Sequence, residues 1–82
     1  MGGFVSEQIA PLLPGFPFYP GDCRFIDKPV DFIIFKGMNE HKIAEVIFLE
    51  AKSGTAKNLN HQEKLLREAI QSGWLRWVQY DF

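Results

Sequence analysis

The sequence predicts an α/β fold in which a short helix, a group of strands, a second helix and a last strand follow one another. Two apolar runs, Val30 to Phe35 and Ile43 to Ala51, are rich in β-branched and aromatic residues, and a segment with Gly and Asn joins them like a hairpin. Asn60 followed by Glu63 marks a helix start. Because a strand after a crossover helix usually pairs parallel to an earlier strand, we expect a mixed sheet.

The length predicts a single domain, residues 1–82. A chain of this size buries only about 60–65% of its unfolded surface, so we expect a homodimer to supply added stability. Hydrophobic residues make up 46% of the chain, with eight Phe and two Trp, which favours a real core over disorder.

At the N-terminal end, residues 3–10 are expected to form a short helix, and Pro11 is tolerated only near its end. Proline then recurs at every third position as far as Pro20. This spacing predicts a stiff, extended connector.

The central elements are predicted to form a hairpin. Val30 to Phe35 is the first strand, Lys36 to His41 is the connection, and Lys42 to Lys52 returns as a long strand. We expect Ser53 to Ala56 to end this strand.

Glu50 and Lys52 are unusual because they follow an otherwise apolar run. In a strand, side chains at i and i+2 point to the same face, so both charges share the face of Val46 and Phe48. Burying either charge alone is costly, and such a pair therefore needs a partner, a metal or a catalytic task.

The second helix is expected to run from Asn60 to about Ser72, with Gly73 as its C-terminal stop. Its inward stripe comprises Leu66, Ala69, Ile70 and Gly73. Gln62 lies four residues before Leu66 and is expected on the same side, near the positive end of the helix dipole.

The last strand is expected over Trp74 to Tyr80, and the topology then lets four side chains converge at one edge of the sheet: Asp31, Glu50, Lys52 and Gln62. Two carboxylates can hold a hard cation such as Mg²⁺ or Mn²⁺ through oxygen ligands. The cation would neutralise a phosphate and activate a bound water, while Lys52 would orient that water or stabilise the transition state. These residue types indicate metal-dependent hydrolysis of phosphodiesters.

Pro29-Val30-Asp31 followed by Glu50-Ala51-Lys52 is similar to the motif of the PD-(D/E)XK nuclease superfamily. The longer pattern resembles the small endonucleases related to archaeal Holliday junction resolvases and covers most of the chain. It comprises Ser6 to Gln8, Pro14 to Phe16, Asp22 to Phe25, Pro29 to Phe35, Phe48 to Gly54, and Asn60 to Gln62. An acidic residue followed by Glu-x-Lys is common by chance, but its place at two strand ends makes the match more specific.

The resemblance implies a restriction-endonuclease-like αβββαβ core, with a mixed central sheet flanked by helices. It further implies a Mg²⁺-dependent endodeoxyribonuclease of the DNA repair or recombination type that acts as a homodimer on DNA. Metal would bind at Asp31 and Glu50, with Glu7 completing the acidic cluster, and Gln62 would support the water or Lys52. Ala51 stands where Val is more usual, and this change should affect packing only.

The residues themselves leave other interpretations open. Glu50 and Lys52 can be a solvated ion pair, Asp31 the polar first residue of a strand, Glu7 a surface acid, and Gln62 a helix-start residue that bonds the backbone. The whole chain can be a non-catalytic module that binds nucleic acid or protein on a nuclease fold. A third alternative is one half of a larger assembly that acts only with its partner.

Four basic residues are candidates for phosphate contact or for ordinary surface charge: Arg24, Lys28, Lys36 and Lys57. His41 and His61 lack the partners of a zinc site, and Cys23 lacks an adjacent His that would make it a nucleophile. The aromatic residues are expected to serve core or dimer packing in preference to base stacking.

Composition excludes several classes of protein. The net charge of −1 argues against coating nucleic acid by bulk charge, although a local metal site remains compatible with it. One cysteine allows no internal disulfide, and the apolar runs are too short to cross a bilayer. With no secretory pattern at the N-terminus, we expect a cytoplasmic, intracellular protein without an organic cofactor.

Overall fold

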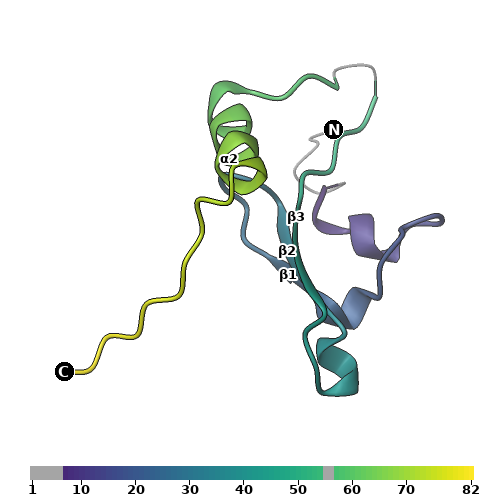
Figure 1. Cartoon of the computed structure of the whole chain (residues 1–82). Coiled ribbons are helices and arrows are strands. Elements are labelled where there is room, and N and C mark those ends of the chain that lie inside the picture. Colours follow the sequence, from purple (N-terminus) through teal and green to yellow (C-terminus); the bar gives the residue numbers. More distant parts are fainter. Residues whose placement is uncertain (1–6, 55–56) are drawn as a thin grey trace.

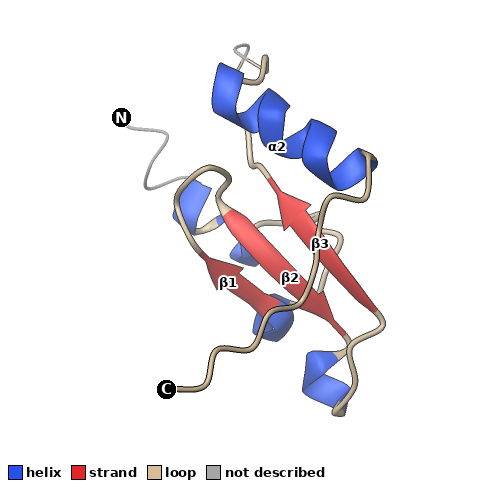
Figure 2. Ribbon diagram, turned by 60° about the vertical axis from the view of Figure 1, so that its left-hand side comes forward, coloured by secondary structure: helices blue, strands red, loops and turns tan. Residues whose placement is uncertain are grey.

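The computed structural model of the chain describes residues 7–54 and 57–82. Its centre is an antiparallel sheet with the strand order β1 (Cys23–Phe25), β2 (Phe32–Lys36) and β3 (Glu45–Leu49). Helix α2 (His61–Gln71) lies at one end of β3, as both Figure 1 and Figure 2 show. The structure thus confirms an α/β protein with three antiparallel strands and one long helix.

β2 is the central strand because its side chains are apolar on both faces. Ile34 is completely buried, and Val30 and Phe32 are nearly so. Phe32 pairs with Phe25 of β1, and the two rings meet edge to face with centroids 5.4 Å apart. Among the residues that the structure describes, these three apolar side chains form the buried core, which is small for a chain of this length.

The connection between β2 and β3 lies where the sequence predicts it. Gly37 has φ 94°, which favours glycine, and the short 3₁₀ helix η3 (Met38–Glu40) follows it. The buried Asp22 carboxylate accepts the backbone N–H groups of Gly37 at 3.1 Å and Asn39 at 2.9 Å. A side chain far away in sequence therefore holds this turn.

Both strands of the hairpin are shifted relative to the prediction. β2 begins at Phe32, so Asp31 lies just before it, and β3 ends at Leu49, so Glu50 and Lys52 lie beyond it. The pairing of Phe32 with Leu49 is the last one of the ladder. Beyond this pair, the N–H groups of Asp31 and Ala51 donate to carboxylate side chains and not to a strand partner.

The proline-rich segment is not extended throughout, contrary to prediction. It contains two 3₁₀ helices, η1 (Ala10–Leu12) and η2 (Pro20–Asp22), each with proline in its first turn. The fixed φ of proline suits the start of such a turn as well as an extended chain. Of the helix expected over residues 3–10, residues 3–6 lie outside the described part, while Glu7 and Gln8 are helical.

Both ends of α2 confirm the prediction. Asn60 Oδ1 accepts the Glu63 N–H at 2.8 Å, and Glu63 Oε1 accepts the Asn60 N–H at 2.9 Å, which completes the capping box. At the other end Gly73 has φ 75° and follows the C-cap residue Ser72. Of the strand break expected at 53–56, residues 55–56 lie outside the described part.

The expected strand over Trp74 to Tyr80 is wrong for the isolated chain. Residues 74–82 pair with no strand among the described residues and are exposed. Figure 1 shows this yellow segment running from the end of α2 away from the sheet. The parallel strand that would make the sheet mixed is therefore not part of it. In the described part of the chain, no helix has the length and apolar character needed to cross a membrane.

Candidate metal-binding active site

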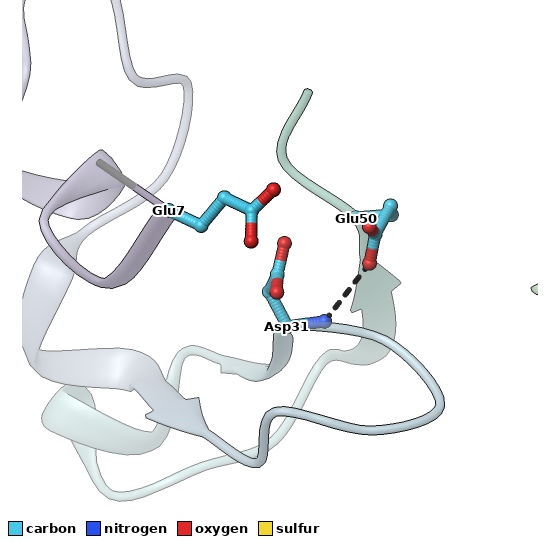
Figure 3. A group of neighbouring side chains, drawn as sticks. All are labelled: Glu7, Asp31 and Glu50. Carbon is cyan, nitrogen blue, oxygen red and sulfur yellow. Dashed lines mark hydrogen bonds between the residues drawn. The ribbon is translucent and has the colours of Figure 1, made fainter. Parts of the chain in front are cut away.

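Three carboxylates from separate segments meet at the end of the sheet nearest α2. Glu7 comes from the N-terminal helical turn, Asp31 immediately precedes β2 and Glu50 immediately follows β3. One oxygen from each lies within 4.8 Å of the others. Figure 3 shows the Glu7 carboxylate directed at that of Asp31, with Glu50 on the far side.

Asp31 and Glu50 hold each other through the backbone. The Asp31 N–H donates to Glu50 Oε1 at 3.1 Å, as Figure 3 shows, and the Ala51 N–H donates to Asp31 Oδ2 at 3.0 Å. This reciprocal bracing follows from the hairpin register, because pairing of Phe32 with Leu49 sets the next residue of each strand face to face. The hairpin thus brings together the two acidic residues of the sequence motif, Asp31 and Glu50.

The segment before Asp31 forms a tight turn that fixes the backbone of Asp31. Asp27 has φ 78°, and the peptide bond between Lys28 and Pro29 is cis. The Asp31 carbonyl accepts the N–H groups of Ile26 at 2.7 Å and Asp27 at 3.3 Å. Asp31 is thereby fixed on both its N–H and its carbonyl side, and only 4% of its surface is exposed.

Burial and mutual repulsion oppose ionisation of all three acids. Burial raises the pKa of Asp31, and the Ala51 N–H only partly offsets this rise. Burial, and then the Asp31 charge, raise the pKa of Glu7. For Glu50, burial is again the largest cause and raises the pKa to about 7. Full ionisation of the cluster is unfavourable without a cation, and this favours binding of one.

Lys52 lies between two carboxylates. Its Nζ is 3.2 Å from Glu50 Oε2 and 3.1 Å from Glu63 Oε1. The hydrogen bond to Glu63 is the main cause that raises the pKa of Lys52; burial acts against this rise, and Glu50 adds to it. Lys52 is therefore a protonated hydrogen-bond donor whose ammonium group is fixed by two carboxylates.

Glu63 is a site residue that the sequence reasoning missed, because it was assigned to the capping box alone. The residue is 6% exposed and bonds both the Asn60 backbone and Lys52. Burial raises its pKa, but the Asn60 N–H, Glu50 and Lys52 together bring it below the ordinary value. Its spacing held a usable clue: Glu63 precedes Leu66 by three residues and Ile70 by seven, so it lies on the inward stripe.

A cleft of about 360 Å³ brings all five predicted catalytic residues together: Glu7, Asp31, Glu50, Lys52 and Gln62. Gln62 is exposed at its wall, and within the described ranges no side-chain hydrogen bond joins it to the cluster. The helix residue that contacts Lys52 is Glu63, one position further along.

The four basic candidates are spread over the molecule. Lys28 lines the cleft, and Lys57 is exposed on the segment before α2. The Arg24 guanidinium donates to the carbonyls of Gly21 at 3.0 Å and Cys23 at 2.9 Å. Lys36 is the last residue of β2, at the end of the strand far from Asp31. It lines a different hollow, near Asp22, so it does not flank the cleft.

The remaining reactive residue types lie elsewhere. The free thiol of Cys23 donates to the Tyr19 carbonyl at 3.5 Å, and burial raises its pKa, so it is not an activated nucleophile. His41 is in the hairpin turn and His61 is the exposed first residue of α2.

A family model described as "endonuclease related to archaeal Holliday junction resolvase" matches residues 1–82. Neither a curated protein nor a solved structure matches the chain.

Proposed function

Since the chain belongs to the family of endonucleases related to archaeal Holliday junction resolvases, we propose that it hydrolyses DNA phosphodiester bonds at the cleft with the help of a divalent cation. The observation that carries the proposal is the meeting of three carboxylates beside a doubly held ammonium group. The strand-end position of Asp31 and Glu50 gives this cluster an open side toward the cleft.

The donor set fits a hard cation. All three groups offer carboxylate oxygens, which suit Mg²⁺ or Mn²⁺ and are a poor match for metals that prefer thiolate or imidazole. Glu7, Asp31 and Glu50 would hold the ion. When bound, such a cation neutralises phosphate charge and lowers the pKa of a coordinated water.

Lys52 acts in this proposal as a charged donor. With its raised pKa it keeps its proton at neutral pH, so it stabilises negative charge on the phosphate or orients the attacking water by donating to it. Glu63 positions the ammonium group from the helix side, and Glu50 does so from the strand side. Gln62, at the cleft wall, is placed to contact substrate or water.

The finer assignments are part of the same proposal. We infer a homodimer acting on branched DNA in repair or recombination, because two cuts in one junction require two sites. Lys28 and Lys57 are the basic residues we assign to phosphate contact, and Arg24 and Lys36 are weaker candidates.

One observation favours the alternative of a non-catalytic binding module. Both oxygens of Glu50 already have partners, the Asp31 N–H and the Lys52 ammonium.

Calorimetric titration with Mn²⁺ separates the two functions. A nuclease binds the ion and loses this binding in the Asp31→Asn variant, whereas a non-catalytic module binds no ion in either the wild type or the variant.

The proposal is tested by a cleavage panel of four-way junction, flap, nicked duplex, plain duplex and single strand, each with Mg²⁺, Mn²⁺ or EDTA. We expect metal-dependent cleavage that Asp31→Asn or Lys52→Ala lowers by about 100-fold or more. Glu40→Gln, in the turn at the other end of the hairpin, is the matched control. Cleavage that persists in EDTA, or survives in folded Asp31→Asn, would refute the proposal.

A further inference from the structure

The C-terminal segment, residues 74–82, exposes an unusual amount of apolar surface. Trp77 is 86% exposed, Tyr80 80% and Phe82 fully exposed. Leaving such side chains in water forgoes a large hydrophobic gain, since each aromatic ring can bury about 150–250 Å². A segment of this composition is expected to be covered in the working protein.

The last four residues of this segment already have the side-chain arrangement of a strand. The rings of Tyr80 and Phe82 stack at 5.7 Å on one side, while Gln79 Nε2 donates to Asp81 Oδ1 at 3.1 Å. Contacts between residues two apart arise when the backbone is extended and alternate side chains share a face. The segment is therefore prepared to pair with another strand.

The end of α2 directs the segment away from its own sheet. The Trp74 N–H donates to the Ala69 carbonyl at 2.8 Å, and the Gly73 N–H donates to Ile70 at 3.1 Å. With Gly73 at φ 75°, these bonds form a Schellman motif, which fixes the direction in which the chain leaves the helix. Figure 1 shows the result, an arm that projects from the body.

A matching surface lies on the same chain. Within the part of the chain that is described, the outer edge of β3 pairs with no strand, and Val46 is 47% exposed there. Beside it, a groove of about 330 Å³ is lined by Val46, Phe48, Leu66 and Ile70. An open strand edge next to an apolar groove is the arrangement that accepts an added strand.

We propose that residues 74–82 of one copy dock on the β3 edge and α2 groove of a second copy, and that the exchange is reciprocal. Each chain carries both the arm and the groove, so a two-fold arrangement satisfies both at once and closes. This assembly would supply the fourth strand that each isolated sheet lacks.

The exposed area of the chain is large enough for an interface of this kind. A compact chain of this mass exposes roughly 5,000 Å², whereas this one exposes 6564 Å². The excess exceeds the roughly 800 Å² that each partner buries in a stable dimer. The radius of gyration, 14.1 Å, is likewise larger than the roughly 12 Å expected for a compact domain of this length.

The first test is sedimentation velocity of the full chain over a concentration series, without DNA or metal. We expect a dimer, and we expect the double variant Trp77→Ser, Tyr80→Ser to weaken it by about 100-fold or more. Both side chains are highly exposed on the arm, so their loss removes much of its apolar surface. Leu12→Ser, an exposed apolar residue of η1, is the matched control and should remain dimeric.

A mixing experiment identifies the docking site. Val46→Arg keeps the arm and damages the groove, while the arm variant keeps the groove. Neither should dimerise alone, but their mixture should form a heterodimer through one intact arm and one intact groove. A synthetic peptide of residues 74–82 should also bind the arm variant, and a scrambled peptide should not.

Circular dichroism shows which variants are folded before these results are compared. A wild-type chain that stays monomeric, an arm variant that stays dimeric, or a peptide that fails to bind the folded arm variant would each overturn the proposal. Because the assays contain neither DNA nor metal, their failure leaves the proposed cleavage activity standing.

Discussion

At the scale of single residues, the position of Lys52 depends on Glu63 as much as on the predicted Glu50. Two buried or half-buried carboxylates hold one ammonium group, at 3.1 Å and 3.2 Å. Pairs of this kind favour a fixed geometry, because moving either partner would leave a charge poorly solvated. Glu63 is therefore a positioning residue for the proposed reaction.

We predict that Glu63→Gln lowers kcat by about 10- to 100-fold with little change in the KM for DNA. Glutamine is accepted at this capping-box position, so the helix start should survive while the charge is lost. The substitution should also lower the pKa of Lys52, visible by NMR titration of its side chain. Glu68→Gln, which removes an exposed charge from the same helix outside the cleft, is the control and should cost less than about 3-fold. Equal losses in both variants would contradict the assignment.

The raised pKa of Glu50 predicts how stability varies with pH. Its ordinary value of 4.5 applies to the unfolded chain, and the folded value is about 7. Between these values the folded state binds more protons, so stability without metal must fall as pH rises. Asp31 and Glu7 shift in the same direction, whereas the lowered pKa of Glu63 acts below this window and Lys52 acts above it.

We therefore expect the metal-free protein to have a lower free energy of unfolding at pH 8 than at pH 5, by up to about 3 kcal/mol. Added Mg²⁺ should reverse this trend by binding the ionised cluster. Urea unfolding with and without EDTA measures both effects. Glu50→Gln should flatten the metal-free pH dependence, and a wild-type stability that rises steadily from pH 5 to 8 in EDTA would rule this account out.

At the scale of elements, α2 could be predicted at both ends because its start and stop are local. Asn60 with Glu63 satisfies the first N–H groups, and Gly73 adopts the left-handed conformation that ends the helix. The end of β3 could not be predicted in this way. It depends on where pairing with β2 stops, and Glu50 binds the backbone of Asp31 there, far away in sequence.

Dependence on contacts far away in sequence also explains why the position of the C-terminal arm, residues 74–82, could not be predicted. The strand expected over Trp74 to Tyr80 does not pair within the described part of the chain, although the contacts of Tyr80 with Phe82 and of Gln79 with Asp81 are those of an extended backbone. Which strand edge receives it depends on the direction of the chain after Gly73, and a pattern of residues does not contain that direction. The carboxylate pair could be found from sequence because motif residues at strand ends are brought together by the hairpin alone.

Gly73 offers a prediction for this element. A Cβ at this position would meet no atom within 4 Å, so the effect of a side chain is confined to the backbone at φ 75°. Gly73→Ala should destabilise the fold by about 1 kcal/mol and redirect the arm, whereas Gly73→Asn, which tolerates this conformation, should have a smaller effect. Urea unfolding and sedimentation measure the two consequences. Identical stability for both variants would exclude a role for the left-handed turn.

At the scale of the whole molecule, the charge distribution indicates that DNA binding in the proposed reaction would depend on a cation. The net charge is −1, and three carboxylates gather where a phosphate would approach in the proposed reaction. Basic residues are dispersed, with Lys28 alone among the four candidates at the cleft wall. Without a cation, the cleft repels the substrate it is proposed to cut.

We therefore predict that Asp31→Asn binds a four-way junction about 5-fold more tightly than wild type in EDTA, because one carboxylate charge near the phosphate is removed. In Ca²⁺, which also prefers oxygen ligands, the order should reverse, since wild type keeps the better ion site. Fluorescence anisotropy at fixed ionic strength measures both affinities. Glu40→Gln removes the same charge at the far end of the hairpin and should change neither by more than about 2-fold, because salt screens a charge that distant. If Asp31→Asn and Glu40→Gln behaved alike in both buffers, the acidic cleft would not be the place where DNA and cation meet.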